Sequence, residues 1–102
     1  MIHIDIKRKN RRVVVHVTGH AKAAAKGEDI VCAAVSVLVL TLQQVMMREK
    51  AQNLEYRLSE GDALITFLQD KKTKPYMHTV MCGFDFMANM YPQYIKLKVN
   101  GE

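Results

Sequence analysis

His20 and Cys32 stand on either side of a short loop, and Cys32 opens an apolar, helix-like segment. Cysteine attacks a carbonyl group as the thiolate. The first turn of a helix, with its unpaired N–H groups and positive dipole end, stabilises such an anion. A histidine beside the thiol supplies the base that removes its proton. A Cys/His dyad of this kind is suited to acyl transfer, so these two residues are the candidate catalytic pair.

The role of Asp29 is open. We expect Asp29 to cap the helix that follows, which places Cys32 at the third helical position. As a cap, its carboxylate accepts a helix N–H and opposes a neighbouring thiolate. Turned toward His20 instead, it orients the ring and favours the imidazolium. The sequence does not choose between these roles.

Small residues surround the candidate pair. Gly19 and Gly27 bracket the loop and suit either a hinge over a substrate or an ordinary permissive turn. Ser36 follows Cys32 by one helical turn on the same face, where its hydroxyl lines the site or bonds back to a helix carbonyl. A cysteine at the start of an apolar helix is often only a packing residue. Spacing alone therefore does not establish the dyad.

The composition bounds the class of protein. With 102 residues, 49% of them hydrophobic, the chain predicts a single domain over residues 1–102 with a proper core. The apolar run from Ile30 to Leu42 is expected to be too short to cross a bilayer, and no signal peptide pattern is present, so we expect a cytoplasmic protein. Two cysteines make no disulfide framework. The net charge of +5 favours ribosomes or RNA as surroundings, although the fifteen Lys and Arg are scattered along the chain.

Hydrophobic periodicity predicts an α+β fold, a single mixed sheet of about five strands with two helices in the order β-β-α-β-β-α-β. Alternation of apolar and polar residues marks the strands, and three- and four-residue spacing marks the helices. The predicted strands are residues 2–6, 13–17, 54–58, 63–69 and 94–99, and the predicted helices are residues 29–50 and 74–91. The first helix is apolar around its axis in its first half, which predicts burial on most sides by the sheet and by a second subunit.

Two other groups of residues were compared with the dyad. His78, Cys82, Asp85 and Asn89 share one face of the second predicted helix. Two soft ligands on one helix are incomplete for zinc, so this face is interpreted as polar surface and we expect neither a metal nor a cofactor. His3 and His16 lie in adjacent strands and face one another in the predicted hairpin, a common arrangement that implies no chemistry.

The segment from Gly19 to Ser36 resembles the ribosomal-processing cysteine proteases of bacteria, the Prp family. The resemblance rests on Gly-His-Ala, a glycine shortly before Asp-Ile-Val-Cys-Ala, and then a serine. It covers about eighteen residues closely and the rest of the chain more loosely. It implies that His20 and Cys32 are catalytic, and it makes Gly19, Gly27, Asp29, Ala33 and Ser36 the candidate supporting or substrate-binding residues.

The resemblance also implies a substrate and a partner. The substrate would be the N-terminal extension of a large-subunit ribosomal protein precursor, removed by this cysteine endopeptidase after a short apolar segment that ends in aromatic residues. The enzyme would be a homodimer associated with ribosome biogenesis. The loop departs from the family pattern, because residues 21–26 are Ala-Lys-Ala-Ala-Ala-Lys where the family often has glycine or an aromatic residue. The alternative function is a non-enzymatic module that binds ribosomes or RNA, which explains the charge but not the motif.

Overall fold

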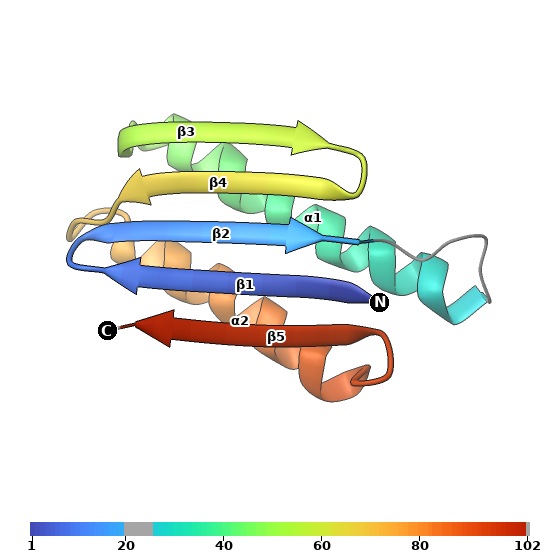
Figure 1. Cartoon of the computed structure of the whole chain (residues 1–102). Coiled ribbons are helices and arrows are strands. Elements are labelled where there is room, and N and C mark those ends of the chain that lie inside the picture. Colours follow the sequence, from blue (N-terminus) through green and yellow to red (C-terminus); the bar gives the residue numbers. More distant parts are fainter. Residues whose placement is uncertain (20–25, 102) are drawn as a thin grey trace.

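The alternating segments of the sequence form five strands of one mixed sheet, and both periodic segments form helices (Figure 1). The computed structural model describes residues 1–19 and 26–101, and the side chains of α1 from residue 30 onward. The elements are β1 (Ile2–Lys9), β2 (Arg12–Thr18), α1 (Lys26–Arg48), β3 (Gln52–Ser59), β4 (Asp62–Leu68), α2 (Lys74–Met90) and β5 (Ile95–Gly101). The predicted fold class and element order are confirmed.

The strands follow the spatial order β3-β4-β2-β1-β5. β1 pairs antiparallel with β2 and parallel with β5, while β4 pairs antiparallel with both β2 and β3. This arrangement makes β4 an interior strand, as its apolar composition indicates. It also brings the end of β2 and the turn between β3 and β4 to the same end of the sheet, since Thr18 lies opposite Asp62.

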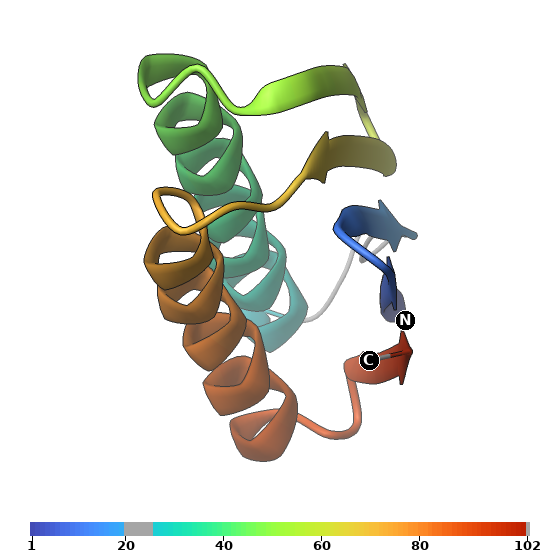
Figure 2. The same ribbon diagram turned by 90° about the vertical axis from the view of Figure 1, so that its left-hand side faces the viewer.

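Both helices cover one face of the sheet and leave the other face open (Figure 2). Alternation in β1 and β2 directs isoleucines and valines toward the helices, where Ile4, Ile6 and Val15 are almost fully buried. Phe67 and Phe84 close the core from β4 and α2, each with no exposed surface. Burying a side chain of this size stabilises the fold by about 1.5–3 kcal/mol relative to leaving it exposed.

Within one chain, α1 packs on the sheet through one stripe of side chains, and the other side of its first half is exposed. The expected burial of that side by a second subunit stays a prediction. Val31, Val35 and Val39 are buried at four-residue spacing. The opposite side of the helix carries apolar residues that remain exposed, with 64% of Ile30 and 61% of Val37 accessible. One face of the sheet plus α2 offers too little surface to cover a helix all round.

The expectation that the apolar segment of α1 is too short to cross a bilayer is corrected. Within α1, the 19 residues Ile30–Arg48 have a mean hydropathy of 2.1 and are by length and composition apolar enough to span a membrane, whereas the sequence-based expectation counted the apolar run only to Leu42. Gln43 and Gln44 are polar but uncharged, so they do not interrupt the segment. The core helix of a soluble protein passes the same test, and here the helix packs its buried stripe on the sheet.

α2 begins where Lys74-Pro75 predicts, after Thr73. Thr73 is fully buried and exchanges hydrogen bonds with Asp70, whose Oδ1 accepts from the Thr73 backbone N–H at 2.9 Å. This backbone bond is the main reason that the pKa of Asp70 lies below its ordinary value. Farther along α2, Gly83 lets the helices approach, since a Cβ there would meet the end of the Leu38 side chain.

Candidate active site

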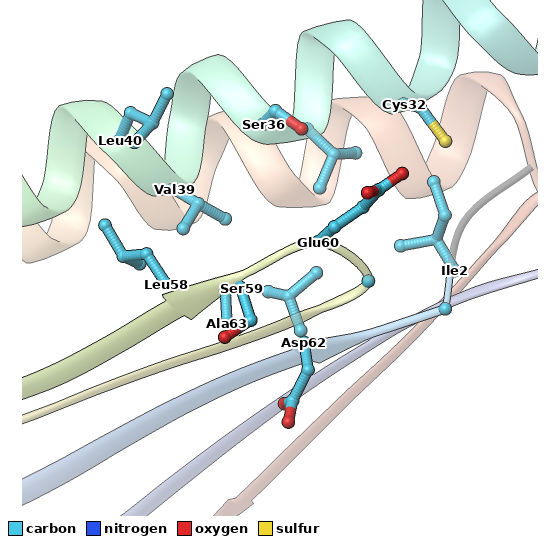
Figure 3. Close-up of a pocket in the computed structure, with 14 residues that line it drawn as sticks. Ile2, Cys32, Ser36, Val39, Leu40, Leu58, Ser59, Glu60, Asp62 and Ala63 are labelled. Atoms are coloured by element: carbon cyan, nitrogen blue, oxygen red, sulfur yellow. The ribbon is translucent and has the colours of Figure 1, made fainter.

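A cleft of about 440 Å³ opens between the first half of α1, the turn joining β3 to β4, and the end of β2 (Figure 3). Cys32 and Ser36 line it from α1, and Gly19 lines it from the chain just after β2. The structure thus brings together three of the predicted site residues. His20 and residues 21–25 of the predicted loop lie outside the described residues.

Cys32 is half-buried and lies at one end of this cleft (Figure 3). Both cysteines, Cys32 and Cys82, are thiols rather than disulfides. One side of Cys32 is therefore packed against the protein, and the other side faces an opening through which a substrate can approach. This is the placement that a nucleophile requires.

The start of α1 corrects the predicted helix cap. α1 begins at Lys26, so Asp29 is its fourth residue rather than the N-cap, and Gly27 lies inside the helix rather than in the loop. Cys32 becomes the seventh helical residue, beyond the first turn in which N–H groups lack helical partners. Activation of the Cys32 thiol by the helix terminus is therefore not supported.

Of the two small residues predicted beside Cys32, Ser36 lines the cleft and Ala33 does not. Ser36 lines the cleft one turn after Cys32, on the same side of α1, as predicted. Ala33 is exposed and is not among the described residues that line the cleft. The preceding residue, Cys32, points to the cleft, and one step along a helix turns the next side chain away by about 100°.

Gly19 fixes the point at which the chain leaves β2, directly before His20. Its φ of 86° is in the left-handed region, and a Cβ at this position would collide with the carbonyl oxygen of Met1. Its N–H donates to the carbonyl of Gly61 at 3.0 Å. This bond ties the start of the predicted loop to the turn between β3 and β4, so Gly19 has a structural role beside the cleft.

The wall opposite Cys32 was not anticipated from the sequence. It comes from the hairpin of β3 and β4, where Leu58 lies beside Val39 of α1 and Glu60 reaches from the turn toward α1 (Figure 3). The sequence identified residues 59–62 only as a turn. Their position beside Cys32 depends on β4 pairing with β2, and no local pattern encodes that strand order.

Asp62 turns its carboxylate away from the cleft, to the open face of the sheet (Figure 3). There it accepts hydrogen bonds from His16 Nε2 at 2.7 Å and from Arg57 Nη2 at 3.0 Å. His3 and His16 do not lie directly opposite one another, because the register places His3 opposite Thr18 and Asp5 opposite His16. The Asp62 network instead joins β2, β3 and β4 behind the turn that forms the cleft wall.

The Asp62 network predicts a pH-dependent contribution to stability. The hydrogen bond from His16, with a further contribution from Arg57, lowers the pKa of Asp62 below its ordinary value of 3.8. A carboxyl group with a lowered folded pKa stabilises the fold above its unfolded pKa, and this stabilisation is lost as pH falls through the folded value. Asp62→Asn should therefore lower the urea midpoint by more at neutral pH than at the lowest pH at which the wild type stays folded. An equal difference at both pH values would contradict the prediction.

The face of α2 that was weighed against the candidate pair is polar and exposed, as predicted. His78, Cys82, Asp85 and Asn89 are exposed, and Cys82 Sγ lies 3.7 Å from His78 Nε2. Among the residues that the structure describes, no group of three or more His, Cys, Asp or Glu side chains could hold a metal ion. The cleft at Cys32 therefore remains the candidate active site.

Comparison with known proteins identifies a protease family and structures of the same fold. The family model described as cysteine protease Prp matches residues 1–96. The protein SMU.848 from Streptococcus mutans shares the fold with a TM-score of 0.79 and 25% identity, over 100% of this chain and 96% of that one. A crystal structure of an essential ribosomal processing protease Prp from S. aureus with a covalently linked product peptide has a TM-score of 0.82 and 21% identity, over 98% and 100%. A structure of the S. aureus protein with a substrate peptide has a TM-score of 0.75 and 18% identity, over the same shares. No curated protein sequence matches.

Proposed function

This chain belongs to the Prp family of cysteine proteases, and we propose that it is the endopeptidase that removes the N-terminal extension of a large-subunit ribosomal protein precursor. The observation that carries the proposal is the half-buried thiol of Cys32 at the end of an open cleft, in a chain whose family model covers residues 1–96. The S. aureus relative is described as a ribosomal processing protease, and its structures hold substrate and product peptides.

The proposed mechanism uses Cys32 as nucleophile and His20 as general base. His20 takes the thiol proton, and Sγ attacks the carbonyl carbon of the scissile peptide bond. The tetrahedral intermediate collapses as His20 donates that proton to the leaving amine, which breaks the C–N bond and leaves a thioester on Cys32. Water, deprotonated by His20, then attacks the thioester and releases the new carboxyl terminus, and the thiol is regenerated.

The cleft suits the apolar segment expected before the cleavage point. Val39 and Leu58 form an apolar channel that leads along α1 to Cys32 (Figure 3). Side chains from the extension would lose apolar surface to water in this channel, at about 25 cal/mol per Å² buried. Glu60 is the charged group that extends toward α1 from the opposite wall, so a basic group near the scissile bond would be favoured there.

Cleavage of the precursor tests the proposal. The purified protein is incubated with the full-length ribosomal protein precursor of its own organism, and the products are weighed by mass spectrometry. We expect a single cut after the apolar segment of the extension, and a peptide spanning the extension should be cut at the same bond. An intact precursor, with cleavage of unrelated peptides retained, would overturn the proposed substrate while leaving the protease activity in place.

The exposed side of α1 supports a homodimer, which we include in the proposal. Ile30, Val37, Leu40 and Met47 are between 44% and 64% exposed along one helix. A contiguous apolar surface of this kind marks an interaction site more often than a solvent-facing side. Sedimentation velocity at micromolar concentration should give a dimer, and a monomer would contradict this part of the proposal. A cytoplasmic location, where ribosomal proteins are made, also belongs to the proposal.

A further inference from the structure

Lysines and arginines that are scattered in the sequence gather at one end of the folded chain. β1, β4 and β5 end there, β2 and β3 begin there, α1 ends there and α2 begins there (Figure 1). Ten of the fifteen basic residues lie at these ends of β1, β2, α1 and α2 or in the turns beside them: Lys7, Arg8, Lys9, Arg11, Arg12, Arg48, Lys50, Lys71, Lys72 and Lys74. We call this set the basic end. Nine of its members are exposed and Arg8 is half-buried.

Few carboxylates offset the basic end. The acidic side chains there, among the described residues, are Glu49, Glu55 and Asp70. Asp70 is occupied by hydrogen bonds from Thr73 and Gln52. Both salt bridges among the described residues involve Asp62, which lies at the opposite end of β4 from the basic end. None of the ten cations therefore forms a salt bridge with a described carboxylate.

Hydrogen bonds of Arg11 hold together segments at the basic end. Arg11 Nη2 donates to Gln52 Oε1 at 2.8 Å and Arg11 Nε donates to the carbonyl of Gln69 at 3.1 Å. These bonds join the turn between β1 and β2 to the start of β3 and the end of β4, and both acceptors are neutral, so the guanidinium keeps its charge. α1 ends and α2 begins at this place, so their opposed dipoles offset one another. The electrostatic potential at the basic end is therefore set by its charged side chains.

The charges are separated along the length of the molecule. The longest dimension is 40 Å. The cleft of Cys32 is lined from the end of β2, the turn between β3 and β4 and the first half of α1. These segments lie at the end of the molecule opposite the basic end (Figure 1). Outside the basic end the chain contains five Lys and Arg and seven Asp and Glu, so its remainder is slightly acidic although the net charge is +5. A polyanion would therefore be attracted to one end and repelled from the other.

We propose that the basic end binds the phosphate backbone of folded RNA, which leaves the cleft free to act on a polypeptide. The cations come from both layers of the molecule, from β1 and β2 in the sheet and from α1 and α2 in the helix layer, so they are not confined to one plane. Cations drawn from two layers can contact phosphates on both sides of an RNA groove. An anionic bilayer favours basic residues on a flat surface beside apolar side chains that insert into it. The inference goes beyond the proposed substrate, because it concerns a surface remote from the cleft.

The test measures binding of the full chain to a fluorescently labelled RNA hairpin by anisotropy, over a range of salt concentrations. The double variant Lys9→Gln/Arg12→Gln removes two exposed charges from the basic end without touching the Arg11 bonds. Its matched control, Lys96→Gln/Lys98→Gln, removes two exposed charges from β5. We expect the first variant to weaken binding by about tenfold or more and to reduce the salt slope by about 2. The control should change binding much less.

Each other result overturns the inference. Equal weakening in both variants would show that net charge alone attracts RNA. Binding to poly-glutamate as tight as to the hairpin would indicate an acidic protein partner, and tighter binding to phosphatidylglycerol vesicles would indicate a membrane. Thermal unfolding checks that both variants are folded, and peptide cleavage should be unchanged in both. Since the binding measurement does not involve cleavage, failure of the RNA inference is distinguishable from failure of the proposed function.

Discussion

Replacing Cys32 by alanine should lower kcat/KM for precursor cleavage by at least about 10³-fold. The thiol supplies the atom that forms the thioester, and no other side chain lining the described cleft has a comparable nucleophile, since the hydroxyl of Ser36 ionises far less readily. The fold should be retained, because Cys32 is half-buried and alanine keeps its helical backbone. Timed mass spectrometry of the precursor measures the change.

Cys82→Ala provides the control for this variant. Cys82 is exposed on α2, outside the cleft, so its removal should leave cleavage within about twofold of the wild type. Full activity of Cys32→Ala would remove Cys32 from the mechanism. Loss of activity in both variants would point instead to a shared effect on folding, which circular dichroism would reveal.

Replacing His20 by alanine should lower kcat by about 10²–10⁴-fold, the range typical of a general acid–base group. Because α1 begins at Lys26, Cys32 lies beyond the turn whose free N–H groups stabilise a thiolate. The imidazole is then the main means of removing the thiol proton, and the residual activity should rise with pH as hydroxide replaces the base. Steady-state kinetics over the pH range separates this loss from a change in KM.

His78→Ala is the matched control for His20. His78 is exposed on α2 and lies 3.7 Å from Cys82, so it also pairs with a cysteine but lies outside the cleft. Its removal should not change kcat. If His20→Ala retains full activity with an unchanged pH profile, the base is another group and the dyad is wrong.

Local sequence patterns predict which segments are strands and helices. How these elements are arranged in the sheet depends on pairing between distant strands. Alternation at Ile2, Ile4 and Ile6 predicts β1 because it follows from one-sided burial of a strand, and these residues are buried. The predicted helix start at Asp29 is wrong, because α1 already begins at Lys26 and Asp29 lies inside it. An acidic residue before an apolar run is compatible with a cap but also with the first turns of a helix that starts earlier.

The parts of the site that the sequence missed depend on contacts between distant residues. Glu60 and Leu58 reach the cleft only because β4 pairs with β2, and His16 finds Asp62 across that same pair. The basic end likewise collects residues from three stretches of the chain, residues 7–12, 48–50 and 71–74. No spacing within a segment encodes such neighbours. In contrast, Cys32 and Ser36 were predicted to share a face because helical geometry alone fixes their relation.

Site-resolved alkylation coupled to activity tests the central claim, that the thiol of Cys32 attacks the substrate. The protein is treated with iodoacetamide at neutral pH, peptide mapping by mass spectrometry follows the modification of Cys32 and Cys82, and each sample is assayed for cleavage. We predict that Cys32 reacts faster, that precursor protects it, and that activity falls in proportion to its modification. Retained cleavage by protein that is fully alkylated at Cys32 would contradict the account.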